Sequence, residues 1–360
     1  MNPKLRSSVS VVKINDTVLE FFKTNTRKQV RLRVENDIIM EIVCSLDGTK
    51  SIMEIANIYN TDSEQLNKLF DFLISKGILE TIDNPDDFDD YKQFRRVIHF
   101  LEDYSTTKQD VVTMWNSIRE SRVLIIGLGA VGSWVAVNLM QAGVRRFAFM
   151  DSDVVDISNL HRQFGYTEND IGNKKIEVLA KKLLRMGDVD VIKYDCFLDE
   201  GSLENVCNAK IDLIINCADK PTVDITSLLV GKYCMEKRIP HIIGGGYNLH
   251  LSLIGQTVLP YETACVKCFE KHLVEENTID PQRVKKLEVK NRKVGSLGPM
   301  CSLIASMIGM ESIKILSKKI RPSNINRRGE FDIYKMNISY KYFERREDCE
   351  WCGQEHEFDY

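Results

Sequence analysis

The sequence has no excess of positive charge. Its 49 lysines and arginines face 52 aspartates and glutamates, so the formal net charge of the 360 residues is −3. A protein that binds nucleic acid over a broad surface needs a surplus of cations to neutralise phosphates. We therefore expect no nucleic-acid partner.

Long apolar runs are also missing. No stretch approaches the uninterrupted apolar length that a membrane helix requires, and the N-terminus, MNPKLRSSVSVVK, lacks the apolar centre of a signal peptide. Ten cysteines in such a chain are expected to stay reduced, where they pack or bind metal rather than form disulfides. These features predict a cytoplasmic protein without a membrane partner.

No internal repeat divides the chain, but its two ends differ in pattern. Short alternating segments such as VRLRVE precede three helical segments, which predicts a small winged-helix domain over residues 1–83. Ser51 and Glu54 have the spacing of a capping box at the start of one helix, and Thr61 and Glu64 repeat it before the next.

An acidic, polar segment over residues 84–120 is expected to link this domain to the rest of the chain. Over residues 121–360, apolar strand candidates alternate with helical ones. This alternation predicts an α/β fold, a mainly parallel Rossmann-like sheet with helices on both faces. Ligands of such sheets bind at the carboxyl ends of the strands.

The first strand of this region runs into a glycine-rich loop, VLIIGLGAVGSW. Gly127 permits a tight turn, Gly129 lets a phosphate approach the backbone, and Gly132 allows the next helix to pack closely on the strand. The amino end of that helix offers unpaired amide groups to an anion. The following strand ends in Asp151, where a ribose-binding carboxylate is expected. This loop alone favours an NAD(P)-dependent dehydrogenase.

The next motif, DSDVVDISNLHRQF, favours a triphosphate instead. A dehydrogenase has no need for Asn159, Arg162 and Gln163 directly after its ribose-binding acid. An enzyme that handles a triphosphate does, because an arginine can pair with phosphate oxygens in a planar, bidentate way.

Two further charged groups follow at the ends of predicted elements. IGNKK places Lys174 or Lys175 at the start of a helix, and LIINCADKP ends a buried strand with Asp219. A carboxylate there is suited to hold a hydrated magnesium ion. Each of these charged residues, taken alone, can be interpreted simply as a surface residue. Their order after a glycine loop favours a nucleotide triphosphate site.

Four cysteines form two CxxC pairs, Cys265 with Cys268 in CVKC and Cys349 with Cys352 in CEWC. Two such pairs predict a tetrahedral zinc site, which has no open position and is therefore structural. Redox-active CxxC motifs are the competing interpretation, but the presence of two pairs favours metal.

The segments GLGAVGSW, DSDVVDISNLHRQ, IGNKK and NCAD, with the CxxC pairs, resemble the ThiF/MoeB family of adenylating enzymes over residues 121–352. The resemblance implies that a carboxylate attacks the α-phosphate of ATP, giving an acyl-adenylate and pyrophosphate. Such a site must neutralise charge and hold an in-line geometry. The resemblance implies that the glycine loop and Gln163 contact the nucleotide and that Asp151 binds its ribose. It also implies that Asn159, Arg162 and Lys175 contact phosphates and that Asp219 holds magnesium. Lys175 is preferred because the family's lysine lies three residues after the glycine.

Family members also insert an arginine from the partner subunit of a homodimer, drawn from a stretch before the glycine loop. FRRVIHF stands in a similar place, so the resemblance makes Arg96, or alternatively Arg95, the candidate and gives residues 84–120 a part in dimer contacts. A linker arginine on a solvated face is the alternative.

Some relatives form a thioester on a cysteine that follows the first zinc pair. Residues 269–299 contain no cysteine, which predicts that the adenylate is used directly. Cys217, which we expect inside a buried strand, and Cys301, in an apolar helix, are interpreted as packing residues, with Cys301 the one open exception.

The first domain resembles the small PqqD-like domains that bind the leader segment of ribosomally made peptides as an extra strand. Its third helical segment has only two lysines, balanced by acids, which is a poor surface for DNA. Dimerisation or structural support are the alternatives. Together the two halves resemble the microcin C- and pantocin-maturing enzymes, which activate a C-terminal carboxyl group and glutamate side chains respectively.

We therefore predict an ATP-, magnesium- and zinc-dependent homodimer that adenylates a carboxylate of a leader-bearing precursor peptide in antibiotic maturation. The main alternative is a MoeB/ThiF-like activator of a ubiquitin-like sulfur carrier. An oxidoreductase and a DNA-binding regulator are further alternatives.

Overall fold

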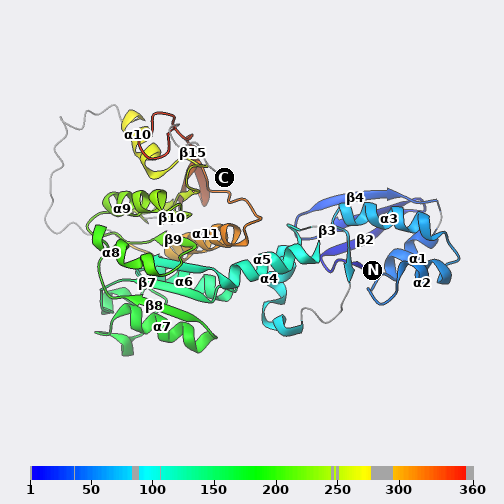
Figure 1. Ribbon diagram of the computed structural model, residues 1–360, viewed down its shortest axis with the longest axis horizontal. Coiled ribbons are helices and arrows are strands. Elements are labelled where there is room, and N and C mark those ends of the chain that lie inside the picture. The colour runs from blue at the N-terminus through cyan, green and yellow to red at the C-terminus, as the bar shows by residue number, and fades with distance from the viewer. Residues whose placement is uncertain are drawn as a thin grey trace. The chain divides into compact units, whose positions relative to one another are not determined.

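The computed structural model describes residues 2–35, 37–82, 89–105, 107–244, 247–248, 251–276 and 295–353. The chain divides into two compact units, Met1–Asn116 and Ser117–Tyr360 (Figure 1). Much of the predicted linker is helical, with η1 (Asp89–Phe94), α4 (Arg95–Glu102) and α5 (Lys108–Glu120), so the division falls within α5. The start of that linker lies outside the described residues.

The first unit combines a small antiparallel sheet with three helices. Strands β2 (Val9–Asn15), β3 (Val18–Lys23) and β4 (Lys28–Arg33) pair in that order, and β1 (Asn2–Leu5) pairs with β5 (Leu79–Ile82). The helices are α1 (Ile38–Cys44), α2 (Ile52–Ile58) and α3 (Ser63–Ser75). They cover one core whose largest buried side chains include Leu19, Phe21, Ile42, Ile55, Leu66 and Phe70. Strands followed by three helices were predicted for this region.

The starts of α2 and α3 differ in their capping. At α2 the predicted capping box is confirmed, because Ser51 Oγ accepts from the Glu54 amide while the Ser51 amide donates to the Glu54 carboxylate at 2.7 Å. At α3 the prediction of Thr61 as cap was wrong. Asp62 caps this helix, with its Oδ1 2.9 Å from the Glu64 amide. An aspartate one residue closer to the helix reaches the free amide directly.

The second unit contains the predicted Rossmann-like sheet. Its six strands lie in the order β13 (Thr257–Val258), β10 (His241–Ile243), β9 (Leu213–Asn216), β6 (Arg122–Ile126), β7 (Arg146–Met150) and β8 (Asp190–Tyr194). Every pairing is parallel except that of β13 with β10. Leu124, Ala148 and Ile214 pack on one face against α8 (Glu200–Glu204) and α9 (Val223–Glu236). Helices α6 (Gly132–Gln141), α7 (Lys175–Met186) and α11 (Gly298–Ser317) complete the covering of the sheet (Figure 1).

A second, antiparallel sheet of β11 (Tyr247–Asn248), β12 (Leu251–Ile254), β14 (Arg327–Asp332) and β15 (Asn337–Tyr342) follows in this unit. Among the described residues, α11 alone is long and apolar enough, by length and composition, to cross a membrane. However, 61% of its apolar window is buried, and it packs along α6. Its composition is that of a core helix.

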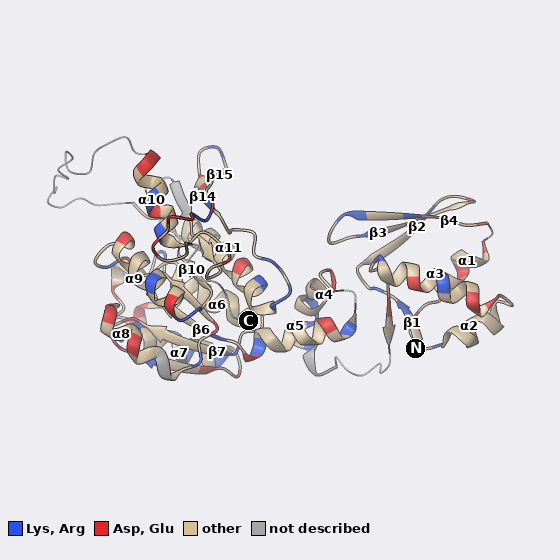
Figure 2. Cartoon of the chain, turned by 45° about the horizontal axis from the view of Figure 1, so that its top comes forward, with Lys and Arg blue, Asp and Glu red and all other residues tan. Residues whose placement is uncertain are grey.

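Charge on the surface is mixed. On α3 and on α10 (Val266–Glu276), basic and acidic residues stand close together (Figure 2). Lys68 Nζ lies 2.8 Å from Glu64, and Lys267 Nζ lies 2.7 Å from Glu270. Pairs of this kind agree with the balanced composition of the chain.

Candidate active site

A pocket opens at the carboxyl ends of β6, β7 and β9, where a parallel sheet is expected to bind its ligand. Most of the predicted site residues line it, namely Gly127, Gly129, Asp151, Asn159, Arg162, Gln163, Lys175 and Asp219. Gly132 lies behind the lining, in the first turn of α6. Arg95 and Arg96 are exposed on α4 of the other unit, and their part in the site stays a prediction.

The three glycines of the loop differ in the space around them. Gly127 has a φ of +84°, which a residue with a side chain rarely adopts, and this fits the predicted turn. A Cβ on Gly132 would overlap the carbonyl oxygen of Gly127, which explains the close approach of α6 to the loop. A Cβ on Gly129 would meet only Gln163 Nε2, at 4.0 Å. The backbone of Gly129 therefore borders open pocket, where a phosphate has room to approach.

Asp151 supports the glycine loop, a role that the sequence did not indicate. Its Oδ2 accepts from the amide of Leu128 at 2.6 Å and its Oδ1 from the amide of Asp153 at 2.7 Å. The Tyr166 hydroxyl donates to the Leu128 carbonyl at 2.8 Å from the other side. Burial raises the pKa of Asp151 although these amides favour the charged form. The predicted contact with ribose would use the remaining lone pairs of this carboxylate.

The structure separates the two candidate lysines. Lys175 is buried at the start of α7, and its Nζ lies in the pocket 3.1 Å from Asp153 Oδ2. Lys174 turns elsewhere, with its Nζ 2.9 Å from the Ser152 carbonyl oxygen and 3.0 Å from Asp195. Lys175 is thus the lysine available to a ligand in the pocket.

Two charged residues of the pocket were missed by the sequence reasoning, Asp153 and Lys220. Lys220 Nζ lies 3.1 Å from Asp153 Oδ1, so that this carboxylate bridges Lys220 and Lys175. Burial opposes the ionisation of Asp153, but hydrogen bonds and charge from both lysines hold its pKa below the usual range. The only sign of them in the sequence was that Asp153 lies two residues after Asp151 and Lys220 directly after Asp219.

Two buried polar atoms of the pocket have no partner among the described residues. These are Arg162 Nε and Gln163 Oε1, although Arg162 Nη1 donates to the Ser158 carbonyl oxygen at 2.6 Å. Unpaired buried donors and acceptors are rare, and at a pocket they indicate a polar ligand. A nucleotide, which has both acceptors on its phosphates and hydroxyl donors on its ribose, fits this pair.

Asn159 and Asp219 also line the pocket. The Asn159 side-chain oxygen accepts from the Asp156 amide at 3.1 Å and so holds the local turn. Asp219 is exposed in the loop after β9, and its carboxylate is the donor type that magnesium prefers.

Cys217 was misplaced by the sequence reasoning. Strand β9 ends at Asn216, and Cys217 follows it in the pocket lining instead of lying inside the strand. Burial raises the pKa of its thiol to about 12, so it stays protonated at neutral pH. A protonated thiol is a poor nucleophile, in keeping with a packing role.

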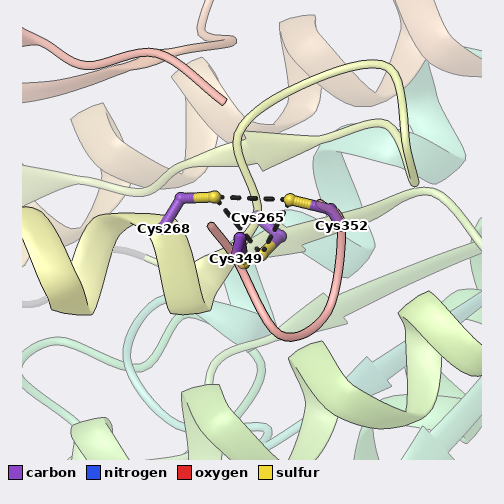
Figure 3. Close-up of side chains that lie close together, drawn as sticks. All are labelled: Cys265, Cys268, Cys349 and Cys352. Carbon is purple, nitrogen blue, oxygen red and sulfur yellow. Dashed lines mark hydrogen bonds between the residues drawn. The ribbon is translucent and has the colours of Figure 1, made fainter. Parts of the chain in front are cut away.

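The four predicted zinc ligands meet in one buried cluster (Figure 3). Cys265 directly precedes α10 and Cys268 lies in its first turn, while Cys349 and Cys352 come from a turn near the C-terminal end of the described chain. Their ligand atoms all lie within 4.8 Å of one another, and the closest pairs are 3.3 to 3.8 Å apart. Four zinc–sulfur bonds of about 2.3 Å in a tetrahedron would place the sulfurs about 3.8 Å apart. The cluster therefore fits one zinc ion.

Comparison with known proteins identifies the family of the second unit. Residues 107–352 match the model of the ThiF family. The molybdopterin-synthase adenylyltransferase of Escherichia coli K12 is 28% identical over 244 residues, which are 66% of this chain and 89% of that protein.

Among solved structures, E. coli MccB with ATP gives a TM-score of 0.76 at 21% identity, covering 98% of this chain and 100% of that one. The Microcin C7 biosynthetic enzyme MccB in complex with N-formylated MccA gives 0.75 at 21% identity, with the same coverage. At such identities the likeness to solved structures establishes a shared fold.

Proposed function

The chain belongs to the ThiF family of ATP-dependent adenylating enzymes, and on that premise we propose that it adenylates a carboxylate of a ribosomally made precursor peptide. The reacting group is the peptide's C-terminal carboxylate or a glutamate or aspartate side chain. One carboxylate oxygen bonds to the α-phosphorus of ATP while the bond from that phosphorus to the β-phosphate oxygen breaks. The products are an acyl-adenylate and pyrophosphate. An amide or other nucleophile then attacks the carbonyl carbon of the adenylate, the bond from that carbon to the phosphate oxygen breaks and AMP leaves, which gives a cyclised, dehydrated or amide-type product.

The observation that carries this proposal is the set of groups around the pocket, a glycine loop with cations and unpaired polar atoms beside it. The loop amides, Arg162 and Lys175 would bind phosphates, and Asp151 would bind ribose. Asp219 would hold magnesium, whose charge stabilises the leaving pyrophosphate. Because both reactants are anions, the main task of these residues is to neutralise charge and to hold the carboxylate in line with the breaking bond.

The first unit supports the proposal that the substrate is a precursor peptide. The ThiF match begins at residue 107, so it leaves nearly all of this unit uncovered, whereas MccB matches the fold of 98% of the chain. That enzyme is described with MccA in a microcin biosynthesis, and we propose that this unit likewise serves a peptide by binding its leader segment. We also propose a cytoplasmic homodimer in which Arg96 of one protomer reaches the site of its partner. The second candidate, an activator of a sulfur-carrier protein, is supported by the molybdopterin-synthase adenylyltransferase relative.

Exchange of labelled pyrophosphate into ATP tests the proposal on the full-length protein. We expect exchange with short leader-bearing peptides that end in a free carboxylate or contain acidic side chains, and a matched peptide without the leader should react with a higher KM. Exchange that depends only on a folded protein ending in diglycine would support the second candidate and refute the first. Tight NADH binding without any response to Mg-ATP would refute both.

A further inference from the structure

The pocket contains a cluster of one carboxylate and two ammonium groups. Asp153 Oδ2 lies 3.1 Å from Lys175 Nζ, and Asp153 Oδ1 lies 3.1 Å from Lys220 Nζ. The three residues come from the segment after β7, the start of α7 and the loop after β9, and all of them line the pocket. In the part of the chain that the structure describes, neither lysine has a second ion-pair partner. The three contacting groups therefore sum to one positive charge, and the more distant carboxylates of Asp151 and Asp219 also act on Lys220 through their charge.

The two lysines differ in exposure. The side chain of Lys175 is 6% exposed, whereas that of Lys220 is 63% exposed and reaches Asp153 from the rim of the pocket. An exposed ion pair of this kind contributes little stability, so Lys220 can turn to another anion at small cost. Lys175, in contrast, is buried at the start of α7.

We infer that Lys220 binds the part of the triphosphate that leaves as pyrophosphate, an inference that rests on the proposed function. Asp151, where ribose is proposed to bind, is buried, whereas the side chain of Lys220 in the same pocket lining is 63% exposed. A triphosphate with its ribose at Asp151 would therefore extend its outer phosphates toward the exposed side of the lining, where Lys220 lies. There Lys220 presents a compact charge, which suits a phosphate. Lys220 also follows directly after Asp219, the proposed magnesium ligand. Asp153 is a positioning residue that holds Lys220 over the pocket.

This role predicts a difference between two nucleotides. AMP lacks the phosphates that Lys220 would contact, whereas ATP has them. A contact with these phosphates therefore strengthens ATP binding and leaves AMP binding unchanged. If Lys220 only supported Asp153 and Lys175, its loss would affect both nucleotides alike.

The test is calorimetric titration of the full-length protein with Mg-ATP and with AMP, without peptide. We expect Lys220→Met to weaken ATP binding about tenfold or more, as for the loss of one charge-assisted hydrogen bond, and to reduce its salt dependence. AMP affinity should stay within about twofold, and Lys220→Arg should restore most of the ATP affinity. The matched control is Lys174→Met. Lys174 is next to Lys175 in the chain but pairs with Asp195, and neither Lys174 nor Asp195 lines the pocket. This control should leave both affinities unchanged.

Two results would overturn the inference: an unchanged ATP affinity in Lys220→Met, or an equal loss for ATP and AMP. Failure of the proposed function looks different, because the wild-type protein itself would then bind neither nucleotide. A wild-type protein that binds both, together with an indifferent Lys220→Met variant, would contradict only the inference.

Discussion

Replacement of Cys349 by serine should weaken zinc binding by the second unit and lower its stability. The cluster joins the start of α10 to a segment 84 residues further along the chain. The cluster is buried among Met235, Val258 and Phe343. Water therefore cannot take the place of a lost ligand there without a cost in free energy. Structural zinc sites bind with about 10–16 kcal/mol, so one of four ligands corresponds to about 3 kcal/mol. In a unit of this size, about 3 kcal/mol lowers Tm by roughly 6–12 °C.

The assay combines the zinc-to-protein ratio from mass spectrometry with Tm from calorimetry. We expect one zinc ion in each wild-type chain and a Tm that falls on treatment with a strong chelator. Cys349→Ser should have a lower Tm and lose its zinc at a lower chelator concentration than the wild type. Cys44→Ser is the matched control, because Cys44 is an exposed cysteine of the first unit outside the cluster. It should retain both zinc and Tm. A wild-type protein without zinc whose Tm ignores the chelator would refute the reasoning, and so would an unchanged Tm in Cys349→Ser.

Three further substitutions test local features. Gly132→Ala places a Cβ against the Gly127 carbonyl oxygen, so we expect a loss of about 2 kcal/mol or more in unfolding free energy and much weaker ATP binding. A variant with the same Tm as the wild-type protein would contradict this packing. Ser51→Ala removes the cap of α2 and should cost about 1 kcal/mol in denaturant unfolding, without any change in ATP affinity. Asp219→Asn should abolish pyrophosphate exchange at an unchanged Tm, since the side chain is exposed, and retained exchange would exclude the magnesium role.

Features that depend on neighbours a few residues apart could be predicted from the sequence. The capping box of Ser51 and Glu54, the turn at Gly127 and the alternation of strands and helices are of this kind, because backbone hydrogen bonding and side-chain period act over short distances. The error at Thr61 was also local, since Asp62 is an equally good cap one residue later. The meeting of the four cysteines was predictable despite the long loop between the two pairs, because the spacing within each CxxC pair suits one metal ion.

Only the tertiary structure decided which charges meet in the pocket. Asp153 contacts Lys175 and Lys220 across 22 and 67 residues of chain, and these contacts depend on the placement of β9 and β7 on either side of β6. The family resemblance had already favoured Lys175 over Lys174, and the direction in which each side chain leaves the start of α7 agrees with that preference. The sequence by itself determined the elements, the loop and the two CxxC pairs, since each depends on nearby residues. The order of the strands in the sheet determined the charge of the pocket, because strand order brings together residues that no local pattern connects.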